Sequence, residues 1–85
     1  MTVEAARAAR VDSYVTVTGR IVSHLREDYS LFADATGEIR VEIEDGVWAG
    51  RPVNPETTVR LRAEVDRNAA GTVSLRVQSL EVLPR

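Results

Sequence analysis

One segment constrains the fold of this chain more than any other: Tyr29–Asp45, which reads YSLFADATGEIRVEIED. Its second half alternates without a break, so that Ile39, Val41 and Ile43 point to one side and charged residues point to the other. A period of two predicts a strand with one buried and one solvent-facing side. The turn Asp34–Gly37 supplies an Asp that bonds its own backbone and a Gly that adopts positive φ freely. The segment therefore predicts a β-hairpin.

Two further stretches alternate in the same way, Tyr14–Leu25 and Thr57–Asp66. Gly19 interrupts the first of them, and a Gly inside a strong strand predicts a bulge or a sharp bend. A last strand begins at Val73, and its apolar phase slips at Gln78–Ser79, which predicts a second bulge. The chain is therefore expected to form five strands.

Two short helices are expected beside these strands. Thr2 is a suitable N-cap for a helix whose Ala-rich run ends at Ala9. Between the third and fourth strands, one helical turn is expected with Asp45 as its cap and Gly50 as its left-handed stop. Trp48, on this second helix, is expected to plug the core; stacking on a ligand is the alternative role.

The order of these elements predicts a mainly β protein, a five-stranded Greek-key OB-fold barrel that occupies residues 1–85 as a single domain. In an OB-fold the binding face lies on strands two and three, between the loop joining strands one and two and the loop joining strands four and five. In this chain the two loops are His24–Asp28 and Asp66–Thr72. The solvent side of the hairpin is therefore the place to look for function.

Composition excludes several classes of site. The chain has no cysteine, so it has no disulfide, thiolate metal site or cysteine nucleophile. Its formal charge of −2 lacks the basic surplus of a protein that grips polyanions. All eleven basic residues are Arg, which indicates either bidentate anion recognition or the codon bias of a GC-rich genome, and no run gathers them. No segment is long and apolar enough to predict a membrane span.

Four parts of the chain resemble the bacterial OB-fold (BOF) family. They are Gly19–Val22, the hairpin Tyr29–Glu44 with its sequence FADATGEI, the helix Val47–Gly50 and the strand end Glu64–Asp66. Their order and spacing extend the resemblance over nearly the whole chain. Two positions depart from the family pattern: Arg20 stands where Asn is common and Ala63 where Gly is common.

The resemblance implies an OB-fold in the cell envelope, associated with tolerance of stress such as peroxide, metal or acid, with no established enzymatic activity. Because members of the family normally begin with a secretory signal, a periplasmic location is expected if the sequence is that of the processed protein. Otherwise the cytoplasm is expected. The resemblance implies no cofactor.

The residue types of the chain argue against both catalysis and metal binding. Covalent hydrolysis usually needs a nucleophile with a His or Lys base, and the chain has one His, no Cys and no Lys. That histidine, His24, is interpreted as a surface loop residue. Glu42, Glu44 and Asp45 lie close in sequence, but a tight site for a hard cation needs six or more oxygen ligands from converging loops. A solvated acidic face is the simpler interpretation.

Binding of single-stranded nucleic acid is the alternative function that an OB-fold suggests. It needs a basic groove with exposed aromatic platforms. The third strand offers Glu38, Arg40, Glu42 and Glu44, which are net negative and include no ring. Tyr29 is the one stacking residue expected on the face, because alternation turns Phe32 toward the core. The residues therefore disfavour nucleic acid.

We therefore expect a non-enzymatic binding module for a small polar ligand, an envelope glycan or a protein partner. The residues expected to bind it lie on the hairpin face and in the two flanking loops: Arg26, Tyr29, Glu38, Arg40, Glu42 and Arg67. For Arg40 there is a simpler alternative, membership in an exposed cross-strand ion pair with a neighbouring carboxylate, which contributes little energy.

Overall fold

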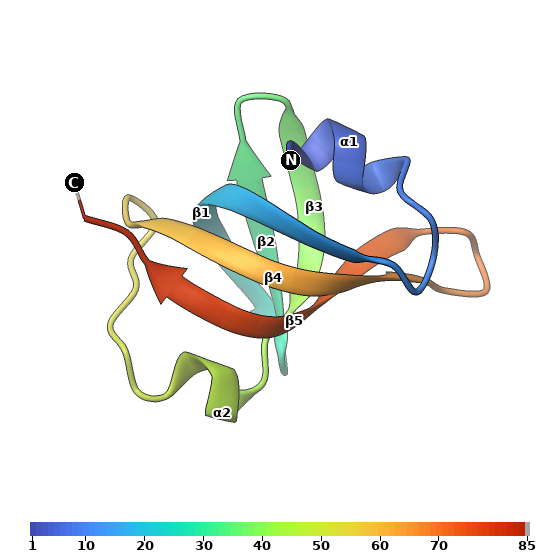
Figure 1. Cartoon of the computed structure of the whole chain (residues 1–85). Helices are drawn as coiled ribbons and strands as arrows, with labels where there is room; N and C mark the ends of the chain where they lie inside the picture. Colours follow the sequence, from blue (N-terminus) through green and yellow to red (C-terminus); the bar gives the residue numbers. More distant parts are fainter. Residues whose placement is uncertain (85) are drawn as a thin grey trace.

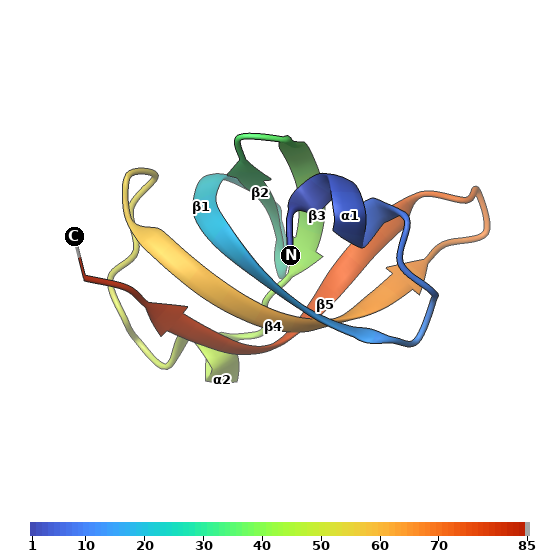
Figure 2. The ribbon, with the colours of Figure 1, turned by 45° about the horizontal axis from the view of Figure 1, so that its top comes forward.

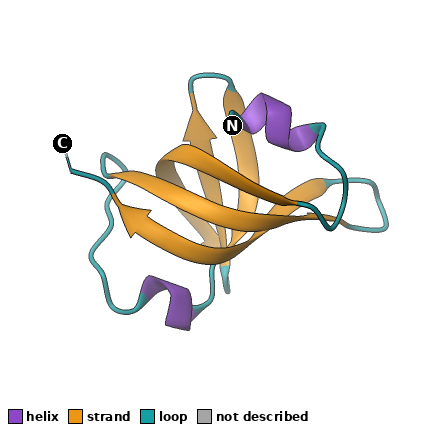
Figure 3. Cartoon of the chain, in the orientation of Figure 1, coloured by secondary structure: helices purple, strands orange, loops and turns teal. Residues whose placement is uncertain are grey.

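The computed structural model describes residues 1–84 and shows a closed five-stranded β-barrel with two short helices (Figures 1 and 3). The strands follow one another around the barrel in the order β1-β2-β3-β5-β4. Their order along the chain, with both helices, is as predicted: α1 Val3–Arg7, β1 Tyr14–Arg26, β2 Tyr29–Asp34, β3 Gly37–Glu42, α2 Asp45–Trp48, β4 Thr58–Arg67 and β5 Val73–Val82. The mainly β OB-fold prediction is confirmed.

A short parallel pairing closes the barrel. All other neighbouring strands run antiparallel, but β3 and β5 pair in parallel, with Arg40 opposite Ser74 and Glu42 opposite Arg76. This pairing places the outward side chains of the hairpin beside those of the last strand. No alternation pattern within either strand specifies it, because it joins residues that are far apart in the sequence.

β1 serves two partners in succession. Its first half pairs with β4 as far as Arg20, and its second half pairs with β2 from Arg20 onward. Gly19 lies at the changeover, where a Cβ atom would meet the carbonyl oxygen of Ala33 at 2.3 Å. The strand curls over there, as Figure 2 shows. The predicted bend is therefore present, but its cause is close backbone approach.

The bulges of β1 come after Gly19 and not at it. Two residues of β1 face one of β2 at two places, so that Val22 and Leu25 are the extra residues. The predicted bulge near the end of β5 is confirmed, because Gln78 is extra between the residues that face Arg62 and Ala63. Bulges twist a strand and redirect its side chains.

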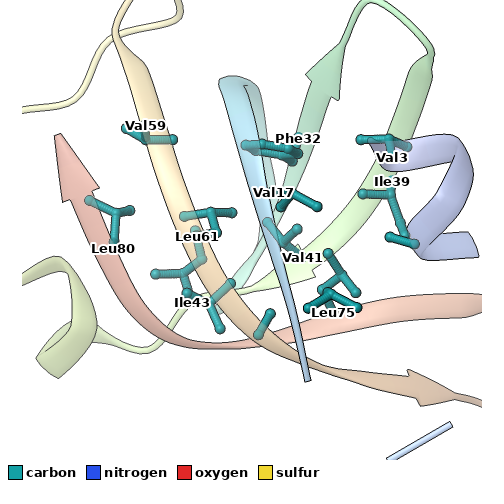
Figure 4. Close-up of a cluster of buried hydrophobic side chains, with 14 of the residues drawn as sticks. Val3, Val17, Phe32, Ile39, Val41, Ile43, Val59, Leu61, Leu75 and Leu80 are labelled. Atoms are coloured by element: carbon teal, nitrogen blue, oxygen red, sulfur yellow. The ribbon is translucent and has the colours of Figure 1, made fainter. Parts of the chain in front are cut away.

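The core draws side chains from every strand and from α1 (Figure 4). The inward residues of β3 and β4 are buried, and Phe32 is fully buried, as alternation predicted, whereas in β5 Val73 is half-buried and Val82 is exposed. The largest fully buried side chains are Phe32, Ile39, Ile43, Leu61 and Leu75. A barrel of this size is filled by its own side chains, so any ligand must lie outside it.

α1 is fixed to the hairpin through its first amide groups. The Thr2 hydroxyl accepts a hydrogen bond from Ala5 N–H at 3.1 Å, as expected of an N-cap. Two caps then come from the hairpin turn: Asp34 Oδ2 accepts from Val3 N–H at 2.8 Å, and Thr36 Oγ1 accepts from Glu4 N–H at 3.0 Å. All three of the first helical N–H groups are thereby satisfied.

α2 differs from the prediction in its bounds and in the depth of its Trp. Glu44 occupies the N-cap position without a side-chain bond, and Asp45 is the first helical residue. Ala49 already ends the helix in the left-handed conformation with a φ of 51°, and Gly50 follows it with a positive φ of 71°. Trp48 packs against the core, as a plug was expected to, but it is only half-buried. Four residues are too few to carry so large a side chain to the barrel axis. Neither helix has the length and apolar character needed to cross a membrane.

Candidate ligand-binding face

A cavity of about 290 Å³ opens where the β1–β2 turn meets the β4–β5 loop. This is the place that OB-fold geometry predicts for a binding site. The lining residues come from the end of β1, the hairpin, the β4–β5 loop and the start of β5: Leu25, Arg26, Glu27, Tyr29, Arg40, Asp66, Asn68 and Ser74.

Local backbone geometry presents these side chains to the cavity. Leu25 is the extra residue of the second β1 bulge, and its side chain is 47% exposed. Glu27 adopts a positive φ of 52°, which allows the tight turn into β2. On the opposite loop, the Asn68 side-chain oxygen accepts hydrogen bonds from the N–H groups of Ala70 and Thr72 and so fixes the loop's shape.

Arg40 is a lining residue with an unpaired hydrogen-bond donor. It points outward from β3 between buried Ile39 and Val41, and it is itself half-buried. Its guanidinium carbon lies 5.3 Å from the centroid of the Tyr29 ring, within the range of a cation–π contact. Its Nε atom is buried and has no hydrogen-bond partner. Such groups usually have one.

Arg40 is not the ion-pair member of the alternative interpretation. Within residues 1–84 no carboxylate forms a salt bridge with it. Its strand neighbour Glu42 approaches Arg76 instead, at 3.5 Å between Oε1 and Nε. The positive charge of Arg40 is therefore left for the cavity.

Arg76 carries the ion pairs of this face. Besides Glu42, it approaches Glu64 at 3.9 Å and Asp66 at 3.7 Å, so three carboxylates surround one guanidinium. The hydrogen bond and charge of Glu42, together with Asp66 and Glu64, raise the pKa of Arg76 above its ordinary value. The sequence did not single out Arg76, because its place beside Glu42 follows from the parallel β3–β5 pairing.

The six residues expected to bind a ligand do not all reach the cavity. Arg26, Tyr29 and Arg40 line it, and Glu42 lies one pair along the face beside Arg76. Glu38 stands opposite Ala33, toward the turn of the hairpin, and does not line the cavity. Nor does Arg67, although its neighbours Asp66 and Asn68 do. Four further lining residues lie in the two loops that the sequence predicted to flank the face: Leu25, Glu27, Asp66 and Asn68. Ser74 was missed because it lies beside Arg40 only through the parallel pairing of β3 with β5.

A second stacked pair lies on the barrel outside the cavity. The Arg62 guanidinium carbon is 5.5 Å from the centroid of the Tyr14 ring, and Tyr14 is 57% exposed. One face of each tyrosine is thus covered by an arginine of this chain. Stacking a nucleobase on that face requires displacing the guanidinium, which weakens both rings as platforms for single-stranded nucleic acid.

No constellation for catalysis or for tight metal binding accompanies the cavity. The His24 imidazole is exposed, and its Nε2 lies 2.8 Å from the backbone oxygen of Glu27, so it is engaged with its own turn. In the part of the chain that the structure describes, no group of three or more His, Cys, Asp or Glu side chains is arranged to hold a metal ion.

Comparison with known proteins yields one family. The model of the family described as "Bacterial OB fold (BOF) protein" matches residues 1–82. Protein YgiW of Escherichia coli K12 is 42% identical over 67 residues, which are 79% of this chain and 52% of that protein. The calcium-regulated OB-fold protein CarO of Pseudomonas aeruginosa is 39% identical over 82 residues, covering 96% of this chain and 70% of CarO. The chain thus spans about half the length of its Escherichia coli relative.

Solved structures agree with this fold. The structure of the hypothetical protein ygiW from E. coli superimposes with a TM-score of 0.93 at 36% identity and covers 98% of this chain and 88% of that one. The telomere capping protein Ten1 from Saccharomyces pombe, at a TM-score of 0.74 and 7% identity, covers 96% of this chain and 77% of its own. At that identity the likeness to Ten1 shows the fold alone.

Proposed function

The chain belongs to the bacterial OB-fold (BOF) family, and we propose that it is a non-enzymatic binding module of the periplasm associated with stress tolerance. Its ligand is a small polar molecule, an envelope glycan or a protein partner, bound at the cavity between the β1–β2 turn and the β4–β5 loop. The observation that carries this proposal is Arg40, whose buried Nε has no partner and which faces a cavity of about 290 Å³. A polar group of a ligand would satisfy that atom.

Binding without catalysis fits the residues that line the cavity. Ser74 lies opposite Asp66 on the paired strand β4 but has no His beside it, because the His24 imidazole is engaged with the backbone oxygen of Glu27. Acyl transfer needs a nucleophile and a base within hydrogen-bond reach. The side chains present can orient and hold a ligand by charge and stacking.

A role in stress tolerance within the envelope is supported by the family and by one relative. The Pseudomonas aeruginosa relative CarO is named as a calcium-regulated OB-fold protein, so regulation by an ion is part of one relative's description. Fractionation of cells that express the complete gene product tests the location. Recovery with periplasmic marker proteins is expected, and recovery with cytoplasmic markers would count against this part of the proposal.

A thermal-shift and NMR screen tests the binding site itself. We would add N-acetylglucosamine, soluble muropeptides, amino acids and short peptides separately, because a ligand that binds only the folded state raises Tm. In ¹⁵N-labelled protein, the expected chemical-shift changes lie in the β1–β2 turn, at Arg40 and in the β4–β5 loop. Micromolar, salt-sensitive binding of fluorescent oligo-dT, with no response to the small molecules, would replace the proposal by nucleic-acid binding.

A further inference from the structure

We propose that the cavity takes a small zwitterion, of the size of an amino acid or a short peptide. Its carboxylate would bind Arg40 and Arg26, and its ammonium group would bind the carboxylates of Glu27 and Asp66. The inference rests on the proposed function and narrows its ligand from polar molecules in general to one chemical class.

The requirement for an anionic group follows from Arg40. Arg40 lies on the outer side of β3 as a half-buried residue, its Nε is buried and unbonded, and its guanidinium stacks on Tyr29. Neighbouring Arg76 has three carboxylates around it, whereas Arg40 has none within residues 1–84. A planar guanidinium with free donors in a recess matches a carboxylate, which accepts two parallel N–H bonds. Arg26 adds a second positive charge to the lining of the cavity.

The requirement for a cationic group follows from two carboxylates in the lining of the cavity. Glu27 lines the cavity and forms no salt bridge in the described part of the chain. Asp66 also lines it; its Oδ1 accepts from Arg67 N–H at 2.8 Å and its Oδ2 approaches Arg76 only to 3.7 Å. Two arginines and two carboxylates thus line one cavity. A dianion such as phosphate would meet the repulsion of both carboxylates, and a polycation would meet that of both arginines.

Size and apolar surface limit the ligand further. A cavity of about 290 Å³ lies at the lower end of the range for small-molecule sites, which begins at roughly 300 Å³. It is large enough for a dipeptide and too small for a folded partner or a duplex. Leu25 and the Tyr29 ring offer an apolar surface for one side chain. Ser74 adds a hydroxyl at the base.

Three related probes separate the charges. Glycyl-L-leucine carries both charges, N-acetylglycyl-L-leucine keeps only the carboxylate, and glycyl-L-leucinamide keeps only the ammonium group. Titration of ¹⁵N-labelled protein at pH 7, followed through backbone and arginine Nε–Hε signals, gives a Kd for each. We expect the zwitterion to bind at least tenfold more tightly than either blocked form and to move the Arg40 Nε–Hε signal.

Two arginine variants provide the matched control. Arg40→Gln removes the proposed anion site, and Arg62→Gln removes the equivalent stacked arginine over Tyr14, outside the cavity. We expect Arg40→Gln to weaken binding of glycyl-L-leucine at least tenfold and Arg62→Gln to leave it within twofold. Arg40→Lys keeps the charge but removes Nε, so an intermediate affinity is expected. Backbone spectra of each variant establish that it is folded.

The outcomes distinguish this inference from the proposed function. Equal affinity for the zwitterion and its acetylated form, or equal affinity of the two glutamine variants, would overturn the zwitterion site. If N-acetylglucosamine or a muropeptide moves the cavity signals and glycyl-L-leucine does not, the inference fails and the proposed function stands. If no small molecule moves these signals, the inference fails and the proposed function is left with a protein partner as its ligand.

Discussion

Replacing Gly19 by Ala should destabilise the barrel at the point where β1 changes partners. A Cβ atom there would lie 2.3 Å from the Ala33 carbonyl oxygen and 2.9 Å from Cζ of Phe32. The Ala33 oxygen belongs to the backbone of a paired strand, and the Phe32 ring is fully buried. Neither can rotate away, so β1 and β2 must separate locally.

The size of the effect follows from overpacking. Adding a methyl group to a filled interior costs about 1–3 kcal/mol, and a clash with backbone on one side and a buried ring on the other belongs at the upper end, about 3 kcal/mol. In a domain of this length, each kcal/mol lowers Tm by about 4–8 °C, so Gly19→Ala should lower Tm by roughly 12–24 °C. That is a large share of the stability of a small domain.

Urea denaturation and thermal unfolding, both followed by circular dichroism, measure the change. Gly46→Ala is the matched control, because a Cβ atom at Gly46 meets nothing within 4 Å and the residue lies in α2. Alanine favours the helical backbone, so the control should be neutral or stabilised by up to about 1 kcal/mol. A Gly19→Ala protein within about 0.5 kcal/mol of the unaltered one would refute the close-approach explanation for this glycine.

Three further changes test other parts of the structure. Asp34→Ala removes the hydrogen-bond acceptor of Val3 N–H and Thr36 N–H, so it should cost about 0.5–2 kcal/mol in urea denaturation; no loss would mean that the hairpin does not hold α1. Partial burial of Asp34 acts to raise its pKa, but hydrogen bonds from the Thr36 hydroxyl and from the N–H groups of Val3, Thr36 and Gly37 outweigh it and hold the pKa below the ordinary 3.8. Because the pKa of Asp34 is lower in the folded state, this carboxylate stabilises the fold fully above the unfolded pKa, and the stabilisation is lost as pH falls from about 3.8 through the folded pKa. The difference in the free energy of unfolding between the unaltered protein and Asp34→Asn should therefore shrink over that pH window. A difference that stays constant down to about pH 2 would contradict this expectation. Trp48→Ala should cost about 2 kcal/mol, less than the 3–5 kcal/mol of a fully buried Trp, because the residue is only half-buried against the core. A loss above about 3 kcal/mol would mean that the ring contributes as much as a fully buried one.

The sequence predicted what depends on neighbours along the chain. The alternation of Ile39, Val41 and Ile43 specified which side of β3 is buried, because side-chain direction in a strand has a period of two. The Asp34–Gly37 turn and the bulge at Gln78 could also be predicted, because each depends on residues that are close together in the sequence. From these elements the OB-fold follows, and with it the approximate place of the binding face.

The parts that were wrong or missed depend on contacts across the barrel. Gly19 is required by the carbonyl of Ala33, fourteen positions later, so the strand pattern alone left open whether a bulge or a bend occurs there. Glu42 is paired with Arg76, and Ser74 lies beside Arg40, only because β3 and β5 run in parallel at that point. Local patterns carry no information about such pairings.

The central claim is that ligand binds at the Arg40–Tyr29 cavity, and a chemical-shift map tests it most directly. Titration of ¹⁵N-labelled protein with glycyl-L-leucine should move signals of the residues that line the cavity, foremost the Nε–Hε group of Arg40. The signals around Tyr14 and Arg62, where an equivalent stacked pair lies outside the cavity, should stay in place. Saturable changes centred on Tyr14 and Arg62, with Arg40 unmoved, would contradict the account.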